Sequence, residues 1–322
     1  MAPRRGDSGE RRSPALTILF GSTAQATHCE TVSEWWPRYR SIAAEHPATI
    51  HQAIAGGFAA DRVGWAFASG YQAALHALFP DAPGDRICAL CVTEAGGNWP
   101  KAIKSSLRKD GSAWVLNGAK RWTTLGPEGS LFFVAARDEA VAGERPAIKV
   151  VRVSSGAPGL TIQAMPQTKF VPEVPHAQLQ FENLTVRETE ILPGDGYADY
   201  VKPFRTVEDI HVQAAVLAYL MREAQRLSWP ENWIERLSAL LAAFSKLADM
   251  PAAQAETHIA VAGALNIGSG LIDEAETFWE ASATDPAALR WRRDRELLKV
   301  AGSAREQRTK RAWKCLKSGM ES

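Results

Sequence analysis

The spacing of apolar residues changes twice along the chain, and each change predicts a different kind of element. Between residues 48 and 80 apolar side chains recur every three or four positions, and Pro80 follows as a stop. This spacing predicts one long helix preceded by a shorter one. Small residues such as Gly57 and Gly70 surround it, which permits either close helix packing or the close approach of a flat ligand. The apolar residues on one face of the longer helix are Val63, Phe67, Tyr71, Ala74 and Leu78.

After the Pro-Gly-Asp segment at residues 83–85 the apolar period falls to about two, and the segments shorten to the length of strands. Asp110-Gly111 and Asn117-Gly118 are tight-turn signals, because glycine accepts a positive φ without steric cost. Several short strands separated by such turns predict a compact barrel or sandwich. We expect strands near residues 87–92, 103–108, 113–116, 131–136, 148–153, 161–164 and 177–181.

Beyond the Pro-Gly-Asp-Gly segment at residues 193–196 the pattern is helical to the end, and four long helices joined by short loops predict an up-down bundle. The expected helices cover residues 207–227, 233–247, 252–281 and 285–316. The predicted fold class is therefore α+β. Its parts are a disordered tail over 1–14, a short N-terminal helical region over 15–84, a central antiparallel β-barrel domain over 85–196 and a C-terminal four-helix bundle over 197–322.

Composition narrows the class of partner. The 322 residues are 46% apolar and 23% charged, and 37 basic against 36 acidic side chains leave a net charge of +1. A net charge this small produces no overall electrostatic attraction for nucleic acid or anionic lipid. No apolar run approaches the length of a membrane span, and the run near the N-terminus, residues 16–20, is too short for a signal peptide, so we expect a cytoplasmic protein.

Cys88 and Cys91 form a C-x-x-C that could be half of a zinc site or a redox pair. They lie in a short apolar run of strand type, where positions three apart point to opposite faces, and no second pair exists to complete four ligands. The seven histidines form no metal-binding helical pair either. We therefore expect no metal site.

Two motifs carry a resemblance to a known family. Residues 91–97 read Cys-Val-Thr-Glu-Ala-Gly-Gly, and residues 117–124 read Asn-Gly-Ala-Lys-Arg-Trp-Thr-Thr. They resemble the Thr-Glu-Pro-Gly loop and the Asn-Gly-x-Lys-x-Trp-Ile-Thr strand of acyl-CoA dehydrogenases, in the same order and at nearly the same spacing. Residues 179–186 and the Arg293-Asp294 pair are also similar to segments of that family. The resemblance implies the family's fold, with FAD as cofactor and a homodimer or higher homo-oligomer as the assembly.

The resemblance also assigns roles in the flavin site. It places the Trp122 indole against the flavin ring, Thr124 near N5, and Thr93 with the Val92 backbone at the pyrimidine edge. A flavin needs an aromatic or apolar wall and a few hydroxyl or N–H groups, and these residues can supply them. The alternative is that Trp122 is a strand core residue and the threonines are ordinary strand hydroxyls.

This sequence departs from the family in the Gly-rich loop and near the C-terminus. The Gly-rich loop is one residue shorter, and Asn98 and Trp99 stand where the family holds its substrate. The glutamate that removes the α-proton is absent near Ala301. Some members carry this base on the first bundle helix, where alignment points to Asp209, with Glu208 beside it. The alternative is that both acids complement a helix N-terminus.

The family's Gln-x-x-Gly-Gly-x-Gly segment is represented at best by residues 266–270. The basic run over residues 290–311 could hold phosphates, or it could be a solvated or ion-paired helix face. The resemblance implies a flavin-dependent oxidoreductase that takes a hydride from an acyl thioester, most simply acyl-CoA. The alternatives are a flavin monooxygenase of the same fold and a non-catalytic binding or partner module.

Overall fold

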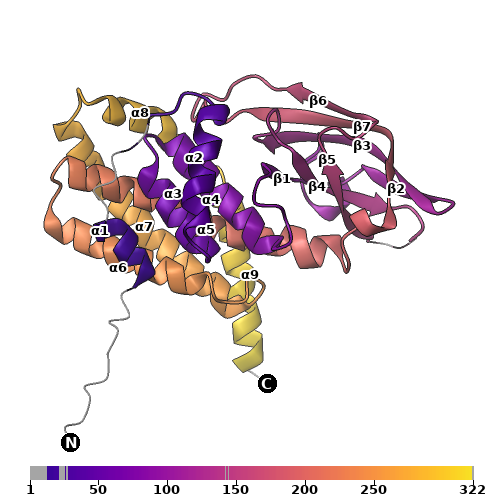
Figure 1. The fold of residues 1–322 in the computed structure, drawn as a ribbon. Helices are drawn as coiled ribbons and strands as arrows, with labels where there is room; N and C mark the ends of the chain where they lie inside the picture. The colour runs from indigo at the N-terminus through magenta and orange to yellow at the C-terminus, as the bar shows by residue number, and fades with distance from the viewer. Residues whose placement is uncertain (1–12, 22–25, 27, 142, 144, 321–322) are drawn as a thin grey trace, which may run out of the picture.

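The computed structural model describes residues 13–21, 26, 28–141, 143 and 145–320. Figure 1 shows the helices gathered on one side and the strands on the other, with the last helix projecting toward the C-terminus. Most of the tail predicted over residues 1–14 lies outside the described residues, and Pro14 already begins the first helix. The N-terminal helices are α1 (Pro14–Gly21), α2 (Val32–Ala44), α3 (Thr49–Ala59) and α4 (Val63–Leu78).

Helix α4 also contacts the sheet. The side-chain amide of Gln72 donates to the Cys88 carbonyl oxygen and accepts from the Cys88 N–H, both at 2.9 Å. The Tyr71 hydroxyl accepts the N–H of Leu90 at 3.2 Å. These bonds satisfy backbone groups of strand β1 (Cys88–Cys91) and fix the sheet against the helices.

The central helix is α5 (Lys202–Arg226), which follows a π-helical turn at Gly196–Val201. Every residue from Asp209 to Ala224 is buried, because other helices cover α5 on several sides. Glycines let α3 and α4 approach it closely. A Cβ on Gly57 would lie 2.1 Å from the Ala215 carbonyl oxygen, and a Cβ on Gly70 would lie 2.6 Å from the Val212 Cα. At these positions the small residues serve helix packing.

The remaining helices are α6 (Glu231–Leu247), α7 (Ala255–Ala281), α8 (Pro286–Asp294) and α9 (Gly302–Met320). The single helix expected over residues 285–316 is wrong, since it is broken between α8 and α9. Residues 295–299 form a 3₁₀ turn there, and Asp294 uses its carboxylate to accept the Val171 N–H at 2.8 Å. This contact between residues far apart in the chain accompanies the end of α8, and the spacing of apolar residues could not predict it.

Seven strands form one sheet in the order β1-β4-β2-β3-β7-β6, with β5 paired to β4. The sheet is mixed rather than wholly antiparallel, because β1 and β2 both run parallel to β4. The strand expected at 103–108 begins later, after a 3₁₀ turn at Pro100–Ala102. The strands after β1 are β2 (Ser106–Asp110), β3 (Ala113–Thr124), β4 (Leu131–Asp138), β5 (Ile148–Ser154), β6 (Leu160–Ala164) and β7 (His176–Val186).

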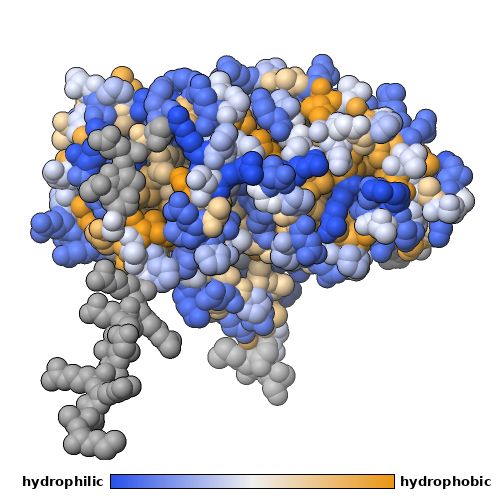
Figure 2. Space-filling model, in the orientation of Figure 1, coloured by the Kyte–Doolittle hydropathy of each residue, from blue (hydrophilic) through white to orange (hydrophobic). Residues whose placement is uncertain are grey.

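Among the described residues, no helix is both long and apolar enough to cross a bilayer. The face in Figure 2 intersperses hydrophilic and hydrophobic residues over both the helical and the strand side.

Candidate functional site

Strands β1 and β3 meet where β1 ends, and this brings the two sequence motifs together. The N–H of Arg121 on β3 donates to the Thr93 carbonyl oxygen at 2.9 Å. Thr93 therefore lies beside the segment that carries Trp122 and Thr124. Val92, Thr93 and Thr124 are half-buried. The four predicted cofactor residues thus lie on neighbouring stretches of β3 and the end of β1.

Trp122 is in a β-bulge. On β3, Lys120 pairs with Leu179 and Thr123 pairs with Ala177, so two residues, Arg121 and Trp122, oppose one on β7. Trp122 has φ +60°, a left-handed conformation that costs a residue with a side chain about 1–2 kcal/mol. Strain of this kind concentrates at functional sites.

The bulge turns the indole outward. Trp122 is 48% exposed, which excludes the alternative of a strand core residue. The backbone N–H of Trp122 donates to the Met165 sulfur at 3.4 Å, the indole ring meets the His176 ring edge-on, and the Arg121 guanidinium lies 5.5 Å from the centroid of the indole. A flat aromatic surface is therefore held in place and open to solvent.

The polar groups beside this surface fit a flavin. The Thr93 and Thr124 hydroxyls form no hydrogen bond with another described residue, so both can serve a ligand. Together with the Trp122 indole they provide the aromatic wall and the hydroxyl groups that the flavin edge requires. The residues present therefore fit the cofactor that the sequence resemblance implies.

A buried ion pair supports this strip from within the sheet. The Lys120 ammonium donates to Glu94 at 2.6 Å and to the Val92 carbonyl oxygen at 3.3 Å. Glu94 also accepts the N–H groups of Lys104 and Ser105, at 2.8 and 3.0 Å. Burial alone would raise the pKa of Glu94, but Lys120 and these hydrogen bonds outweigh it and lower that pKa. Through its ammonium group, Lys120 thereby holds the Val92 carbonyl oxygen beside the buried ion pair.

The shortened Gly-rich loop is ordered by three contacts. Glu94 and Gly97 exchange backbone hydrogen bonds of 2.9 and 3.0 Å. Gly97 has φ +118°, and the Trp99 ring occupies the space that a Cβ there would need. Asn98 accepts a hydrogen bond from Arg205 of α5 at 3.1 Å, which joins the strand side to the helical side. The predicted substrate residues thus lie on a fixed loop beside α5.

Asp209 and Glu208 lie in the second turn of α5 but have different surroundings. Asp209 is buried, and its two carboxylate oxygens accept hydrogen bonds from Arg305 at 2.8 Å and Arg308 at 2.7 Å, both on α9. Arg308 also reaches the Arg205 carbonyl oxygen at 3.2 Å. Asp209 therefore ties α9 to α5. This part of the basic run is an ion-paired helix face, as one sequence alternative held.

Glu208 is half-buried and accepts no hydrogen bond from a described residue. Burial, with a smaller contribution from the Asp209 charge, raises the pKa of Glu208 to about 7. The Tyr71 ring packs edge-on against Phe204, one turn before Glu208 on α5, and the Glu208 charge contributes, after burial, to the raised pKa of Tyr71. Because Tyr71 also contacts Leu90, Glu208 lies near the strand that leads into Val92 and Thr93.

Other predicted positions carry no comparable group. Ala301 is half-buried in the turn before α9 and offers only its backbone, whose carbonyl oxygen accepts the Arg305 N–H. Residues 266–270 lie within α7 and form no glycine loop. Cys88 and Cys91 are buried in β1, and burial raises the pKa of each thiol to about 12. No cluster of three or more potential metal ligands occurs in the described part of the chain.

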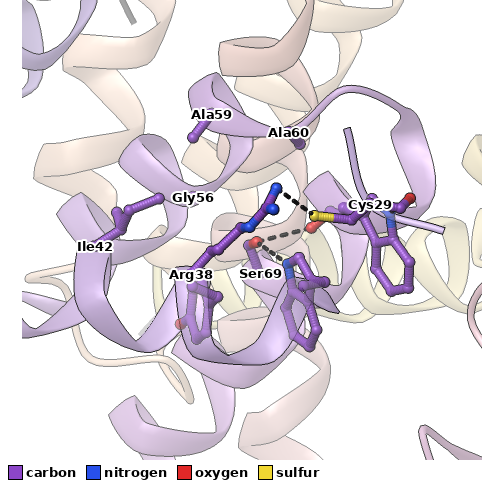
Figure 3. Close-up of a pocket in the computed structure, with 10 residues that line it drawn as sticks. Cys29, Arg38, Ile42, Gly56, Ala59, Ala60 and Ser69 are labelled. Carbon is purple, nitrogen blue, oxygen red and sulfur yellow. Dashed lines mark hydrogen bonds between the residues drawn. The ribbon is translucent and has the colours of Figure 1, made fainter. Parts of the chain in front are cut away.

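A separate small cavity lies among the N-terminal helices (Figure 3). Its volume is about 40 Å³, room for water rather than for a substrate. Arg38 donates to the Cys29 sulfur at 3.3 Å, and Ser69 links Trp35 to the Trp65 carbonyl oxygen. We assign this cavity to packing.

Sequence reasoning missed Tyr71, Arg121 and Lys120 as parts of the site. Arg121 and Lys120 stand inside the quoted motif, and their positions next to Trp122 could have indicated them. Tyr71 could not be found in this way, because only the tertiary fold brings α4 to the end of β1.

Comparisons with known proteins agree with this geometry. The family model for the acyl-CoA dehydrogenase middle domain matches residues 89–184. Benzylmalonyl-CoA dehydrogenase of Aromatoleum aromaticum is 30% identical over 144 residues, which are 43% of this chain and 36% of that protein. Short-chain specific acyl-CoA dehydrogenase of Homo sapiens is 32% identical over 122 residues, 37% of this chain and 29% of that protein. The matches thus span about a third of these relatives.

Solved structures match over nearly the whole chain. A putative acyl-CoA dehydrogenase from Mycobacterium smegmatis aligns with a TM-score of 0.69 at 16% identity, covering 97% of this chain and 98% of that one. Butyryl-CoA dehydrogenase from Megasphaera elsdenii aligns with a TM-score of 0.68 at 14% identity, covering 93% of each. The fold is therefore that of the acyl-CoA dehydrogenases, which confirms the predicted fold class. Residues 89–184 thus resemble the acyl-CoA dehydrogenase middle domain in sequence, and the chain as a whole shares the fold of these structures.

Proposed function

We propose that this protein is an FAD-dependent oxidoreductase that removes two hydrogens from an acyl thioester, and that Glu208 is its base. The observation that carries the proposal is the pair of features on either side of Tyr71. An unpaired carboxyl with a pKa of about 7 lies on α5, and the strip of Val92, Thr93, Trp122 and Thr124 lies at the end of β1 and β3.

FAD, when bound, supplies an acceptor for a hydride. Trp122 provides the wall for its ring, and Thr93 and Thr124 provide hydroxyl groups for its polar edge. The Val92 backbone, held by Lys120 through its carbonyl, contributes at the same edge. These are the roles that the resemblance assigns, and the exposed indole and unengaged hydroxyls support them.

Glu208 has the properties of a general base. An acyl thioester loses an α-proton to a base and a β-hydride to the acceptor, which leaves an α,β double bond. A base whose pKa lies near the working pH combines a useful ionised fraction with a strong affinity for the proton. Burial gives Glu208 such a pKa, and no cation is paired with its carboxylate among the described residues.

Asp209, the other candidate, serves a different purpose in this proposal. Both of its oxygens are engaged by Arg305 and Arg308, so taking up a proton would break one of two charge-assisted bonds. We assign it to anchoring α9. Asn98 accepts a hydrogen bond from Arg205, three residues before Glu208 on α5, and we propose that Asn98 and Trp99 limit which thioester enters.

The likeness to benzylmalonyl-CoA dehydrogenase and to short-chain acyl-CoA dehydrogenase favours an acyl-CoA substrate. One structural neighbour, the prolyl acyl carrier protein oxidase AnaB, acts on a carrier-bound acyl group and aligns with a TM-score of 0.70 at 16% identity, covering 94% of this chain and 97% of that one. A carrier-bound thioester is therefore the second candidate. A homodimer is the assembly we propose, by analogy with the family.

The first experiment is anaerobic mixing of the FAD-loaded protein with a panel of saturated acyl-CoA thioesters. Loss of the visible flavin band and formation of the enoyl thioester are expected in the wild type. The Glu208→Gln variant is expected to bind FAD but to leave it oxidised. A wild-type protein that binds FAD and reacts only with a reductant and oxygen would favour the monooxygenase. A protein that cannot be loaded with flavin would favour the non-catalytic module.

A further inference from the structure

His176 begins strand β7, beside the residues that we propose for the flavin. In the antiparallel register of β3 and β7 it pairs with Thr124, and its carbonyl oxygen accepts the N–H of Met165, just after β6, at 2.8 Å. Directly opposed residues carry their side chains on the same face of a sheet. Thr124, His176 and Met165 therefore form one row, with His176 in the middle.

This row lies on the side of the sheet that a ligand can reach. The neighbouring pair, Thr123 and Ala177, is buried, and successive side chains of a strand point to opposite faces. Thr124 and His176 are only half-buried. The imidazole also meets the Trp122 indole, with ring centroids 6.1 Å apart and planes inclined at 73°. Two of the proposed flavin residues thus have His176 as a direct neighbour.

The imidazole is fixed through one edge. It forms a hydrogen bond with the Val174 backbone, and its ring bonds no other described residue. A neutral imidazole that uses one nitrogen in this way keeps the other for a second partner. Burial lowers the pKa of His176, and the Val174 bond opposes that shift only in part. The ring is therefore largely neutral at pH 7 and takes up a proton as the pH falls.

The charged groups around this row leave His176 without a counter-charge. Strand β6 has no ionisable residue. The ionisable residues of the adjoining strands and loops are Lys120 and Arg121 on β3, Glu182 on β7, and Glu128, Lys169 and Glu173 in the loops. Lys120 is paired with Glu94, and Glu173 with Arg293. No charged side chain in the described part of the chain contributes to the pKa of His176. A proton on His176 therefore adds a positive charge that none of these carboxylates neutralises.

We propose that His176 contacts the bound flavin beside Trp122 and Thr124, and that its protonated form favours the reduced cofactor. A hydride adds two electrons and one proton to the flavin, so the flavin ring gains one negative charge. A positive charge beside the ring stabilises that form. The inference rests on the proposed function for the presence of FAD, but it does not depend on which thioester supplies the hydride.

The test compares the wild type with His176→Gln and His176→Phe, neither of which takes up a proton at this position. Phenylalanine also keeps a ring against Trp122. The matched control is His258→Gln on α7, because His258 is also half-buried, hydrogen-bonds a backbone carbonyl and has a pKa lowered by burial. Circular dichroism melting establishes that each variant is folded. The reduction potential of bound FAD is then measured against redox dyes at low and at high pH.

The wild type should favour reduced flavin more strongly than either His176 variant as the pH falls. Between about pH 8 and pH 5 we expect this difference to grow tenfold, or by about 30 mV for a two-electron couple. His258→Gln should follow the wild type. Glu208 is present in every protein compared, so its own titration cancels. A difference that stays constant with pH would overturn the proposal even if flavin still binds.

A second measurement needs no substitution. Because linkage between two sites is reciprocal, reduction of the flavin should raise the pKa of His176, which the histidine resonances of the wild type report. An unchanged pKa would contradict the proposal, including the case in which neither variant folds. Both shifts in a protein that no thioester reduces would keep His176 in the flavin site and reject the proposed oxidoreductase reaction. A wild type that takes up no FAD would reject both.

Discussion

Glu208 and Asp209 are adjacent carboxylates on α5 that the fold has put to opposite uses. Asp209 gives both oxygens to Arg305 and Arg308, whereas Glu208 is half-buried without a cation paired to it among the described residues. The Asp209 charge adds to the effect of burial in raising the pKa of Glu208 to about 7. The carboxylate of Asp209, which has a structural role, thus helps to raise the pKa of the proposed catalytic base beside it.

Ionisation of Glu208 should therefore raise the activity of the protein and lower its stability. We expect kcat/KM to rise with pH and to level off above about 7, because the base must be ionised. Glu208→Gln should abolish thioester-dependent flavin reduction over the whole pH range. The check is stopped-flow reduction between pH 5 and 9. A wild-type profile without an inflection in that range would argue against Glu208 as the base.

The same residue should lower stability at alkaline pH. A carboxyl whose folded pKa is above its unfolded value of 4.5 binds more protons when folded, so its contribution to stability falls as pH rises from about 4.5 to 7. Glu208→Gln should then be about 2 kcal/mol more stable than the wild type at pH 8. Near pH 5 the two should be nearly equal. Urea unfolding at both pH values measures the difference.

Asp209→Ala should loosen α9. The change leaves Arg305 and Arg308 without their carboxylate, and breaking a largely buried pair of this kind costs roughly 3 kcal/mol. Urea unfolding should show the loss, and trypsin should cut within the Lys- and Arg-rich α9 faster than in the wild type. Glu306→Gln is the control, because its pair with Lys310 is exposed and worth less than about 0.5 kcal/mol. Equal digestion of the two variants would contradict the anchoring role.

Trp122 should separate cofactor binding from stability. Trp122→Gly and Trp122→Ala both remove the indole, so both should weaken FAD binding at least tenfold. At φ +60° alanine keeps the left-handed strain and glycine does not, so the glycine variant should be about 1 kcal/mol more stable. Flavin titration and urea unfolding give the two measurements. Equal stability of the variants would mean that the bulge relaxes once the indole is gone.

Lys120→Met should destabilise the protein by about 3 kcal/mol, since it leaves Glu94 buried without its cation. Adding Glu94→Gln should recover part of the loss, because no uncompensated charge then remains. Thermal and urea unfolding of the single and double variants test this. A double variant less stable than Lys120→Met alone would show that Glu94 acts chiefly through the N–H groups of Lys104 and Ser105.

The sequence predicted the structure best where motifs and the spacing of residues close in the chain determine it. The motifs that contain Thr93 and Trp122 indicated the proposed flavin residues through their resemblance to the family, and the helical spacing around Tyr71 indicated α4. The break between α8 and α9 could not be read in this way. It depends on Asp294 binding the Val171 backbone, a contact between residues remote in sequence.

The two carboxylates show the same limit. From the sequence, Asp209 and Glu208 could be either bases or acids that complement a helix N-terminus, and the alignment pointed to Asp209 as the base. Their difference arises from the turn that brings Arg305 and Arg308 of α9 back over α5. The sequence pattern of α5 does not indicate which of the two side chains, Glu208 or Asp209, contacts α9.

The burial of α5 also constrains how the chain can fold during synthesis. Gly57 on α3 and Gly70 on α4 pack against α5, and the entire strand segment lies between these partners in the sequence. The faces of α3 and α4 that pack on α5 cannot be covered by it until α5 has been synthesised. The strands have local partners and can pair before that point. Nascent chains stopped before α5 should therefore bind chaperones through α3 and α4, and release them only once α5 is complete.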